Sequence, residues 1–470
     1  MNTQLSLDRA SGIITHHAVK RTTASRLVYA LQPSNVNFSR DLPSQDEPGK
    51  RPPAHISGVN ALTIDRFEGR YLLSGGADSS VAIWDLESQT RNAGGFETYA
   101  PLTAVQKTTE EHKLGITQIS FYPFDSLAFL TSSYDHTVKI YSSETLTPSA
   151  SFDLDSVVYN IALSPIASHL LVACATQSPS VRLVDLRSGA STHSLAGHTG
   201  AILSTAWSPV REHIVASGAT DGSVRFWDIR RSVGELGVLD LEDSTGIPNI
   251  NDNRAAPQFS RNSSQAKAHK GPVNGIVWTE DGRHMVTCGH DNRIRVWNTE
   301  TCANTLANFG PMVRNSGLAP CIPILAPAQN LEIEKDVLFY PNEHEILGYE
   351  MFEGKLFRRL RRPEQQKRSF EIAAEASASS SSAAARSKKL NVKDRITALA
   401  WRAHDVEMYS AHADGGITAW KPHTEEDADL DEEDQREREM KEEGKKRKRG
   451  VLDEIYAGLT KKPITFGGLS

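Results

Sequence analysis

A unit of short apolar runs recurs along this chain. Its clearest copy spans residues 198–231, where three runs of alternating apolar and polar residues are separated by turns at Ser208-Pro209 and Asp221-Gly222. Period-two alternation over so few residues, bounded by turn residues, predicts antiparallel strands rather than helices. We expect a fourth, outer strand from the segment before the next copy. Such a unit is typical of one blade of a β-propeller.

Four copies share polar residues at matching positions. A histidine precedes an aspartate by 23 residues in three copies and by 22 in the fourth. A buried imidazole and a buried carboxylate both need hydrogen-bond partners, so these residues are expected to stabilise each blade, not to catalyse a reaction. The pattern is typical of WD40 repeats. The predicted tetrads are His55, Ser74, Asp78 and Trp84; His112, Thr131, Asp135 and Tyr141; His198, Ser217, Asp221 and Trp227; and His269, Thr287, Asp291 and Trp297.

Three further copies are less regular. Residues 157–187 keep the apolar pattern but have Val184 where a tryptophan is expected, and residues 331–360 show two or three strands without a tetrad. The last copy has no leading histidine but retains Ser410, Asp414 and Trp420. We therefore predict an all-β fold, a seven-bladed WD40 β-propeller. Six or eight blades remain alternatives, because the sixth rests on strand patterning alone.

The N-terminal residues 1–25 are predicted to form a helix-loop-helix. Residues 3–22 mix apolar side chains with cations and fit two short helices broken at Ser11-Gly12, while a frayed tail is the alternative. Leu27, Tyr29 and Leu31 alternate in the following segment. This alternation predicts a strand that joins the last blade and closes the ring.

The propeller is expected to span residues 26–423, with two insertions. Residues 232–268 are rich in serine and asparagine without a period, which predicts a long mobile loop. Residues 363–390 include a low-complexity run of serine and alanine, which predicts disorder.

Residues 424–470 are expected to form a disordered tail of opposite charge blocks. Eight acidic residues lie within residues 425–434, and a compact basic run follows. Such runs serve as nuclear-import signals or contact polyanions, with a solvated tail as the plainer interpretation. We predict nuclear import through Lys445, Lys446, Arg447, Lys448 and Arg449.

Composition and charge exclude several functional classes. The net charge of −6 does not indicate a nucleic-acid binder, and no apolar run reaches the roughly 18 residues of a membrane span. The four cysteines lack a CxxC spacing and are predicted to be buried thiols in a reducing compartment, so the protein should be cytosolic or nuclear. Phosphate-loop, dinucleotide and HExxH motifs are absent, and His16-His17 is an isolated pair. We expect a non-enzymatic interaction protein without cofactor or metal.

The fourth copy ends in a motif that includes an arginine which the blade itself does not require. Trp227 and Asp228 are followed by Arg230, whose guanidinium is expected at the rim of the ring. There it can pair with a carboxylate of a partner. WD40 substrate receptors of cullin-4 RING ubiquitin ligases show this W-D-x-R pattern. The alternative is an arginine that caps its own blade turn.

The chain also resembles a particular WD40 family. The stretch HISGVNALTIDRFEGRYLLSGGADSSVAIWDLE is similar to the first blade of the Cockayne syndrome group A family. The segments RLVYAL, VVYNIALSP, VRLVDLRSG, DNRIRVWN and NTLANFG fit the same family, and the resemblance covers about residues 3–423. The insertions, the missing histidine of blade seven and the basic C-terminal run depart from it.

The resemblance implies a substrate receptor in transcription-coupled nucleotide-excision repair, acting at stalled RNA polymerase II. The implied partners are the large subunit of the damaged-DNA-binding complex as ligase adaptor, cullin-4 and a RING subunit through that adaptor, and the Cockayne syndrome group B translocase. We expect neither a membrane association nor direct DNA contact. The alternative is a WD40 scaffold or histone-peptide reader without a ligase role. The expected adaptor-binding residues are Leu5, Ile13, Ile14, Val19, Trp227, Asp228 and Arg230.

Overall fold

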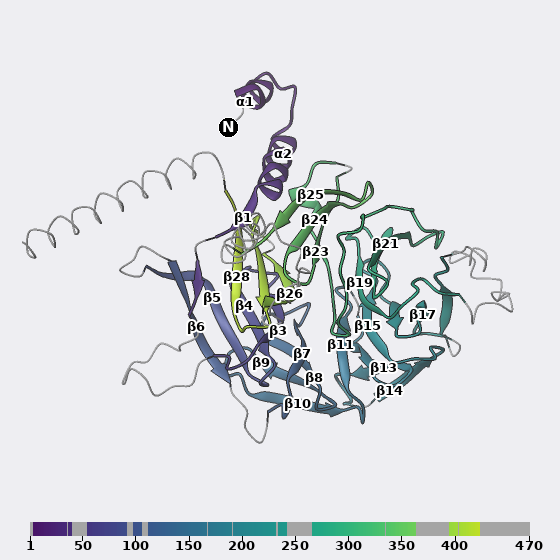
Figure 1. Ribbon diagram of the computed structural model, residues 1–470. Coiled ribbons are helices and arrows are strands. Elements are labelled where there is room, and N and C mark those ends of the chain that lie inside the picture. The colour runs from purple at the N-terminus through teal and green to yellow at the C-terminus, as the bar shows by residue number, and fades with distance from the viewer. Residues whose placement is uncertain are drawn as a thin grey trace, which may run out of the picture. The chain divides into compact units, whose positions relative to one another are not determined.

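Seven small, largely antiparallel sheets make up the described part of the chain, preceded by two helices (Figure 1). This confirms the predicted seven-bladed β-propeller. The computed structural model describes residues 3–34, 36–39, 54–91, 97–105, 111–166, 168–189, 191–231, 234–241, 266–333, 335–362, 394–402 and 404–423.

In each blade, strands that follow one another along the chain pair antiparallel and the first of them lies innermost, while the N-terminal segment adds the outer strand of the last blade. Blade one contains β3 (Val59–Ile64), β4 (Tyr71–Gly76), β5 (Val81–Arg91) and β6 (Glu97–Val105), with β2 (Asn37–Phe38) added outside β6. Blade two contains β7 (Ile116–Phe121), β8 (Ala128–Ser133), β9 (Thr137–Ser142) and β10 (Pro148–Asp153); blade three contains β11 (Val158–Leu163), β12 (Leu171–Thr176), β13 (Ser180–Asp185) and β14 (Ser191–Ala196). Blade four contains β15 (Ile202–Trp207), β16 (Ile214–Ala219), β17 (Val224–Asp228) and β18 (Glu235–Val238).

The remaining blades depart more from the repeat. Blade five contains β19 (Val273–Trp278), β20 (His284–Gly289) and β21 (Arg293–Asn298); blade six contains β22 (Ile324–Leu325), β23 (Val337–Pro341), β24 (Ile346–Glu350) and β25 (Lys355–Leu360), with the short helix η2 (Ala328–Asn330) between β22 and β23. Blade seven contains β26 (Ile396–Trp401), β27 (Met408–His412), β28 (Ile417–Pro422) and β1 (Leu31–Pro33).

The ring is closed by the N-terminal segment, as predicted. Strand β1 pairs antiparallel with β28, with Leu31 opposite Pro422. The position of the predicted strand was wrong, however, because α2 (His16–Tyr29) continues through Leu27 and Tyr29. No glycine or proline interrupts this helix, and Val28 is fully buried against blades six and seven. Helical packing of that side chain overrides the local alternation.

Hydrogen bonds between neighbouring first strands hold the blades together. The Asn60 amide donates to the Ile116 carbonyl at 2.9 Å, and the Thr117 hydroxyl donates to the Val158 carbonyl at 2.7 Å. The Thr397 hydroxyl of blade seven donates to the Val59 carbonyl of blade one. A side chain at the start of one inner strand therefore satisfies backbone of the next blade.

Part of the predicted 232–268 insertion belongs to the propeller. Strand β18 pairs with β17 and supplies the outer strand of blade four, and Leu239 is fully buried. The expectation of a loop across that whole range was therefore wrong. Residues 363–390, for which we predict disorder, lie outside the described residues. The basic run at residues 445–449 lies outside them as well.

Candidate protein-docking site

The predicted tetrads form connected hydrogen-bond chains inside the blades. In blade four, the Trp227 indole donates to the Ser217 hydroxyl at 2.7 Å, which lies 2.7 Å from His198 Nε2. Equivalent contacts join Trp84, Ser74 and His55 in blade one, and Trp297, Thr287 and His269 in blade five. In blade two, His112 contacts Thr131 at 2.7 Å and Asp135 at 3.0 Å.

A hydroxyl outside the predicted tetrads completes three of these chains. Ser223 lies between His198 and Asp221: its Oγ is 2.9 Å from His198 Nδ1 and donates to Asp221 Oδ1 at 2.6 Å. Ser80 in blade one and Thr137 in blade two contact the corresponding histidine and aspartate. A signal for these residues is present in the sequence, since each hydroxyl follows its aspartate by two residues.

The aspartates remain charged because their hydrogen bonds outweigh burial. Desolvation by itself raises the pKa of Asp221, but donors from His198, Ser223 and Thr199 lower it below its ordinary value. The pKa of Asp135 is lowered against the same desolvation by His112 and Thr137. These groups are fully committed to one another, which leaves them no nucleophile or base for a substrate.

Blade seven rebuilds the tetrad from unexpected residues. His412 lies two residues after Ser410 on β27, and its Nε2 is 2.9 Å from the Ser410 hydroxyl that accepts from the Trp420 indole. Arg362, which follows β25 of blade six, donates to Asp414 at 2.7 Å and to Thr418 at 2.8 Å. Asp414 therefore faces an arginine, whereas the aspartates of blades one, two and four contact a hydroxyl that also contacts the histidine. No spacing rule within a repeat predicts such a contact, because it joins two blades.

The N-terminal helix-loop-helix forms as predicted. It consists of α1 (Thr3–Ala10) and α2, whose N-cap is Thr15. Ile13 in the connecting loop is 75% exposed, while Ile14 and Val19 are half-buried. Leu5 lies in α1, and its side chain is outside the described residues. Leu7, which was not among the predicted residues, is 63% exposed and adds to this apolar surface.

The second half of α2 is anchored on the propeller. Arg21 donates from Nε to the Leu331 carbonyl at 2.8 Å and from Nη2 to the Ala328 carbonyl at 2.9 Å, at helix η2 of blade six. The Arg358 guanidinium donates to the Tyr29 carbonyl at 2.7 Å. These contacts, and the run of α2 directly into β1 (Figure 1), fix the direction in which the helix leaves the ring. The boundary at residue 25 is therefore too early, since the fold requires α2 up to Tyr29.

Arg230 caps its own blade turn. Its Nε and Nη2 donate to Asp228 Oδ1 and Oδ2 at 3.0 and 2.9 Å, and Asp228 is buried. Together with the Arg230 backbone N–H, the guanidinium lowers the pKa of Asp228 against the opposing effect of burial. The Arg230 side chain is nevertheless 62% exposed. The structure thus shows the alternative, a structural cap; partner binding by the remaining exposed surface stays a prediction.

The predicted docking elements share one face of the ring, here called the α2 face. It consists of the loops that join the first to the second strand, and the third to the fourth strand, of each blade. Helix η2, whose Ala328 carbonyl accepts a hydrogen bond from Arg21 of α2, lies in one such loop. Arg230 follows the third strand of blade four and lies in another. The Ala328 N–H donates to Glu280 of the adjoining blade-five loop at 3.3 Å. Exposed apolar side chains in these loops are Phe67, Phe124, Leu127, Ile166, Val210 and Ile333.

Metal-binding and thiol chemistry find no support in the described part of the chain. No group of three or more histidine, cysteine, aspartate or glutamate residues there has the geometry of a metal site. The four cysteines are free and buried, and burial raises the pKa of the Cys174 thiol to about 12. No helix among the described residues is long and apolar enough to span a membrane.

Comparison with known proteins identifies the repeats. The WD domain, G-beta repeat model matches residues 47–85, 104–142, 189–228 and 262–298. The chain is 28% identical to WD repeat-containing protein ATCSA-1 of Arabidopsis thaliana over 88% of this chain and 94% of that protein. It is 30% identical to radiation-sensitive protein 28 of Saccharomyces cerevisiae over 51% and 49% of the two chains. It is 26% identical to ribosome biogenesis protein ytm1 of Neurospora crassa over 52% and 54%. The chain is thus a WD40 repeat protein similar to ATCSA-1 over most of its length.

Proposed function

We propose that this protein is the substrate-recognition subunit of a cullin-4 RING ubiquitin ligase in transcription-coupled nucleotide-excision repair. The observation that carries the proposal is the helix-loop-helix, anchored at α2 and exposing Leu7 and Ile13 next to the propeller. The similarity to ATCSA-1 over nearly the whole of both chains supports it. The adaptor is the large subunit of the damaged-DNA-binding complex, which links the chain to cullin-4 and the RING subunit.

The physical basis of adaptor binding is burial of aliphatic surface on a partly prearranged segment. Each aliphatic side chain that becomes buried contributes about 1.5–3 kcal/mol before ordering costs. The contacts of Arg21 and Val28 already order the second half of α2, so only α1 and the loop lose freedom on binding. Arg230 adds an exposed ionic contact worth about 0–1 kcal/mol. The helices therefore dominate the affinity, and Arg230 tunes the orientation.

The role of the propeller is to bind substrate proteins and present them to the ligase, not to transfer ubiquitin. With the adaptor on the α2 face, the opposite face of the ring is free for the Cockayne syndrome group B translocase and stalled RNA polymerase II. The tetrad residues satisfy one another and offer no catalytic pair.

We also propose that the basic run at residues 445–449 directs the protein to the nucleus. Neutralising all five cations should then leave the protein in the cytoplasm by fluorescence microscopy.

Co-purification of the adaptor with the full chain tests the proposal. Ile13→Asp should abolish co-purification without changing the melting temperature, because the 75% exposed side chain supports no core contact. The matched control is Ile56→Asp, the same change at a 69% exposed position before β3, on the other face. Arg230→Ala should weaken binding by no more than about fivefold.

A folded Ile13→Asp variant that retains the adaptor would contradict the docking model. Failure of the unaltered chain to bind the adaptor would favour a WD40 scaffold or histone-peptide reader instead. Recovery of preribosomal particles would favour a role like that named for the ribosome biogenesis relatives.

A further inference from the structure

Blade five has an incomplete outer edge. Among the described residues it is the one blade with three strands, and β21 meets the following segment only at a bridge between Trp297 and Asn304. The chain then turns away at Leu306, which has a φ of +60° and a side chain that is 82% exposed. In blade four, by contrast, β18 continues alongside β17 as far as Arg225. The N-terminal half of β21 therefore lacks a neighbouring strand.

The unpaired backbone groups belong to Ile294. In an antiparallel sheet, alternate residues direct their N–H and C=O groups to opposite sides. Thr299 donates to Arg283 on the β20 side, whereas Asn298 donates to Ala303 and Val296 accepts from Thr305 on the outer side. Ile294 shares the outer side with Val296 and Asn298, but none of the described residues hydrogen-bonds to its outward N–H and C=O. An edge of this kind can pair with a strand from another chain.

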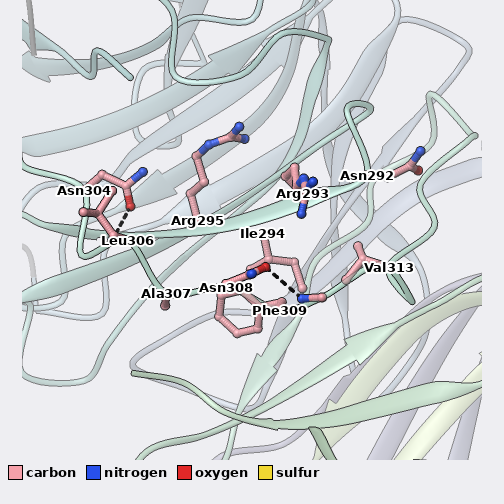
Figure 2. Close-up of a pocket in the computed structure, with 11 residues that line it drawn as sticks. Asn292, Arg293, Ile294, Arg295, Asn304, Leu306, Ala307, Asn308, Phe309 and Val313 are labelled. Atoms are coloured by element: carbon pink, nitrogen blue, oxygen red, sulfur yellow. Dashed lines mark hydrogen bonds between the residues drawn. The ribbon is translucent and has the colours of Figure 1, made fainter. Parts of the chain in front are cut away.

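A preformed cavity adjoins this edge. It has a volume of about 240 Å³ and lies between β21 and residues 304–310 (Figure 2). The side chains of Ile294, Phe309 and Val313 line it and belong to the core shared with blade six. The Phe309 ring packs edge-on against Tyr349 at 5.2 Å, so this wall is held in place by blade six. A ligand would not have to order the wall, which lowers the entropic cost of binding.

The polar lining favours a carboxylate. Arg293 and Arg295 line the cavity, and none of its lining residues is acidic. Arg295 is paired with Asp291 at 2.7 Å, whereas Arg293 is exposed and has no ion pair among the described residues. The side-chain oxygens of Asn304 and Asn308 accept from the backbone N–H groups of the segment itself (Figure 2), so their amide nitrogens remain as donors.

We propose that the outer edge of blade five binds an extended, acidic peptide segment of a partner protein. The segment adds a fourth strand beside Ile294 by backbone hydrogen bonding, and one of its carboxylates pairs with Arg293. Strand addition supplies affinity without sequence preference, while the arginine and the apolar cavity select the side chains. This site is separate from the helix-loop-helix and does not rest on the ligase role.

The test uses the full chain and a fluorescein-labelled peptide of seven residues, alternating valine and glutamate and blocked at both ends. Fluorescence anisotropy should show saturable binding, weakened about tenfold or more by Arg293→Glu, since charge reversal removes the carboxylate partner. The matched control is Arg283→Glu, the same change at a 74% exposed side chain of blade five outside this cavity. It should bind as the unaltered chain does.

Hydrogen exchange of the backbone amides distinguishes strand addition from nonspecific electrostatic binding of the peptide. Hydrogen exchange at the Ile294 amide should slow when the peptide is bound, and a peptide methylated at alternate backbone nitrogens should not bind. Absence of saturable binding, equal effects of Arg293→Glu and Arg283→Glu, or binding without protection at Ile294 would each overturn the proposal.

Discussion

Blades four and seven build the same buried centre from different positions in the chain. In each blade a serine accepts from the tryptophan indole and meets an imidazole: Ser217 with His198, and Ser410 with His412. His198 precedes the first strand of its blade, whereas His412 lies on the second strand. What the blades share is therefore a satisfied serine–tryptophan centre rather than a fixed order of residues.

In the five blades that have a tetrad serine or threonine, the side chain two positions after that residue explains why the centre holds a single imidazole. Where a histidine enters from the preceding loop, this position is small: Gly76, Ser133, Ala219 and Gly289 in blades one, two, four and five. A Cβ on Gly76 would lie 2.7 Å from His55 Nδ1, so no larger side chain fits beside that ring. Blade seven has no incoming histidine, and His412 takes the space.

Removing the shared acceptor should cause the largest loss and tests whether the two centres are equivalent. Ser217→Ala and Ser410→Ala each leave an indole N–H and an imidazole nitrogen in the core without a hydrogen-bond partner. We expect each to lower the free energy of unfolding by roughly 2–6 kcal/mol, at about 1–3 kcal/mol for each of the two unpaired groups, as measured by urea denaturation. Ser217→Thr and Ser410→Thr are the controls, since Thr287 fills this role in blade five. A much smaller loss at Ser410 would show that blade seven does not depend on its rebuilt centre.

Removing the aspartates should separate the two blades. Asp221 accepts from Ser223, Thr199 and the backbone around its hairpin, and Asp221→Ala should cost ~1–3 kcal/mol. Asp414 faces Arg362 and is the more exposed carboxylate, so Asp414→Ala should cost about 1 kcal/mol or less. Thermal unfolding of both variants under one buffer condition measures the difference. An unchanged melting temperature for Asp221→Ala would contradict the tetrad assignment.

Acid should weaken the fold through the buried imidazoles, with blade seven contributing. Burial lowers the pKa of His412 and of His269 below the ordinary value of 6.5. The unfolded chain therefore takes up protons first, so stability is lost as the pH falls from about 6.5 towards the lowered folded values. Below about pH 4 the lowered pKa of Asp221 continues the loss. His412→Gln should flatten the upper part of this dependence in unfolding measurements between about pH 7 and 5; an unchanged slope would exclude His412 as a contributor.

The structure of the N-terminal segment is harder to predict from the sequence than that of the propeller. The tetrads repeat with 22 or 23 residues between histidine and aspartate, so the blades that carry them can be counted along the chain. Leu27, Tyr29 and Leu31 also alternate, yet two of the three are helical, because Val28 packs into the core between blades six and seven. The local residues fit either structure, and contacts with residues some 300 positions away decide between them.

Fold class, the tetrads of blades one, two, four and five and the existence of the N-terminal helix-loop-helix follow from the amino-acid order, because each depends on periods and spacings within about 30 residues. The count of seven blades needed the tertiary structure as well, since blade six carries no tetrad. Which distant groups meet is decided only when the chain folds. Folding joins Arg362 to Asp414, turns Arg230 onto Asp228, uses β18 to complete blade four and leaves Ile294 of blade five without a pairing strand on its outer side. The physical reason is that hydrogen bonds and packing act over a few ångströms in space, and separation along the chain does not encode that distance.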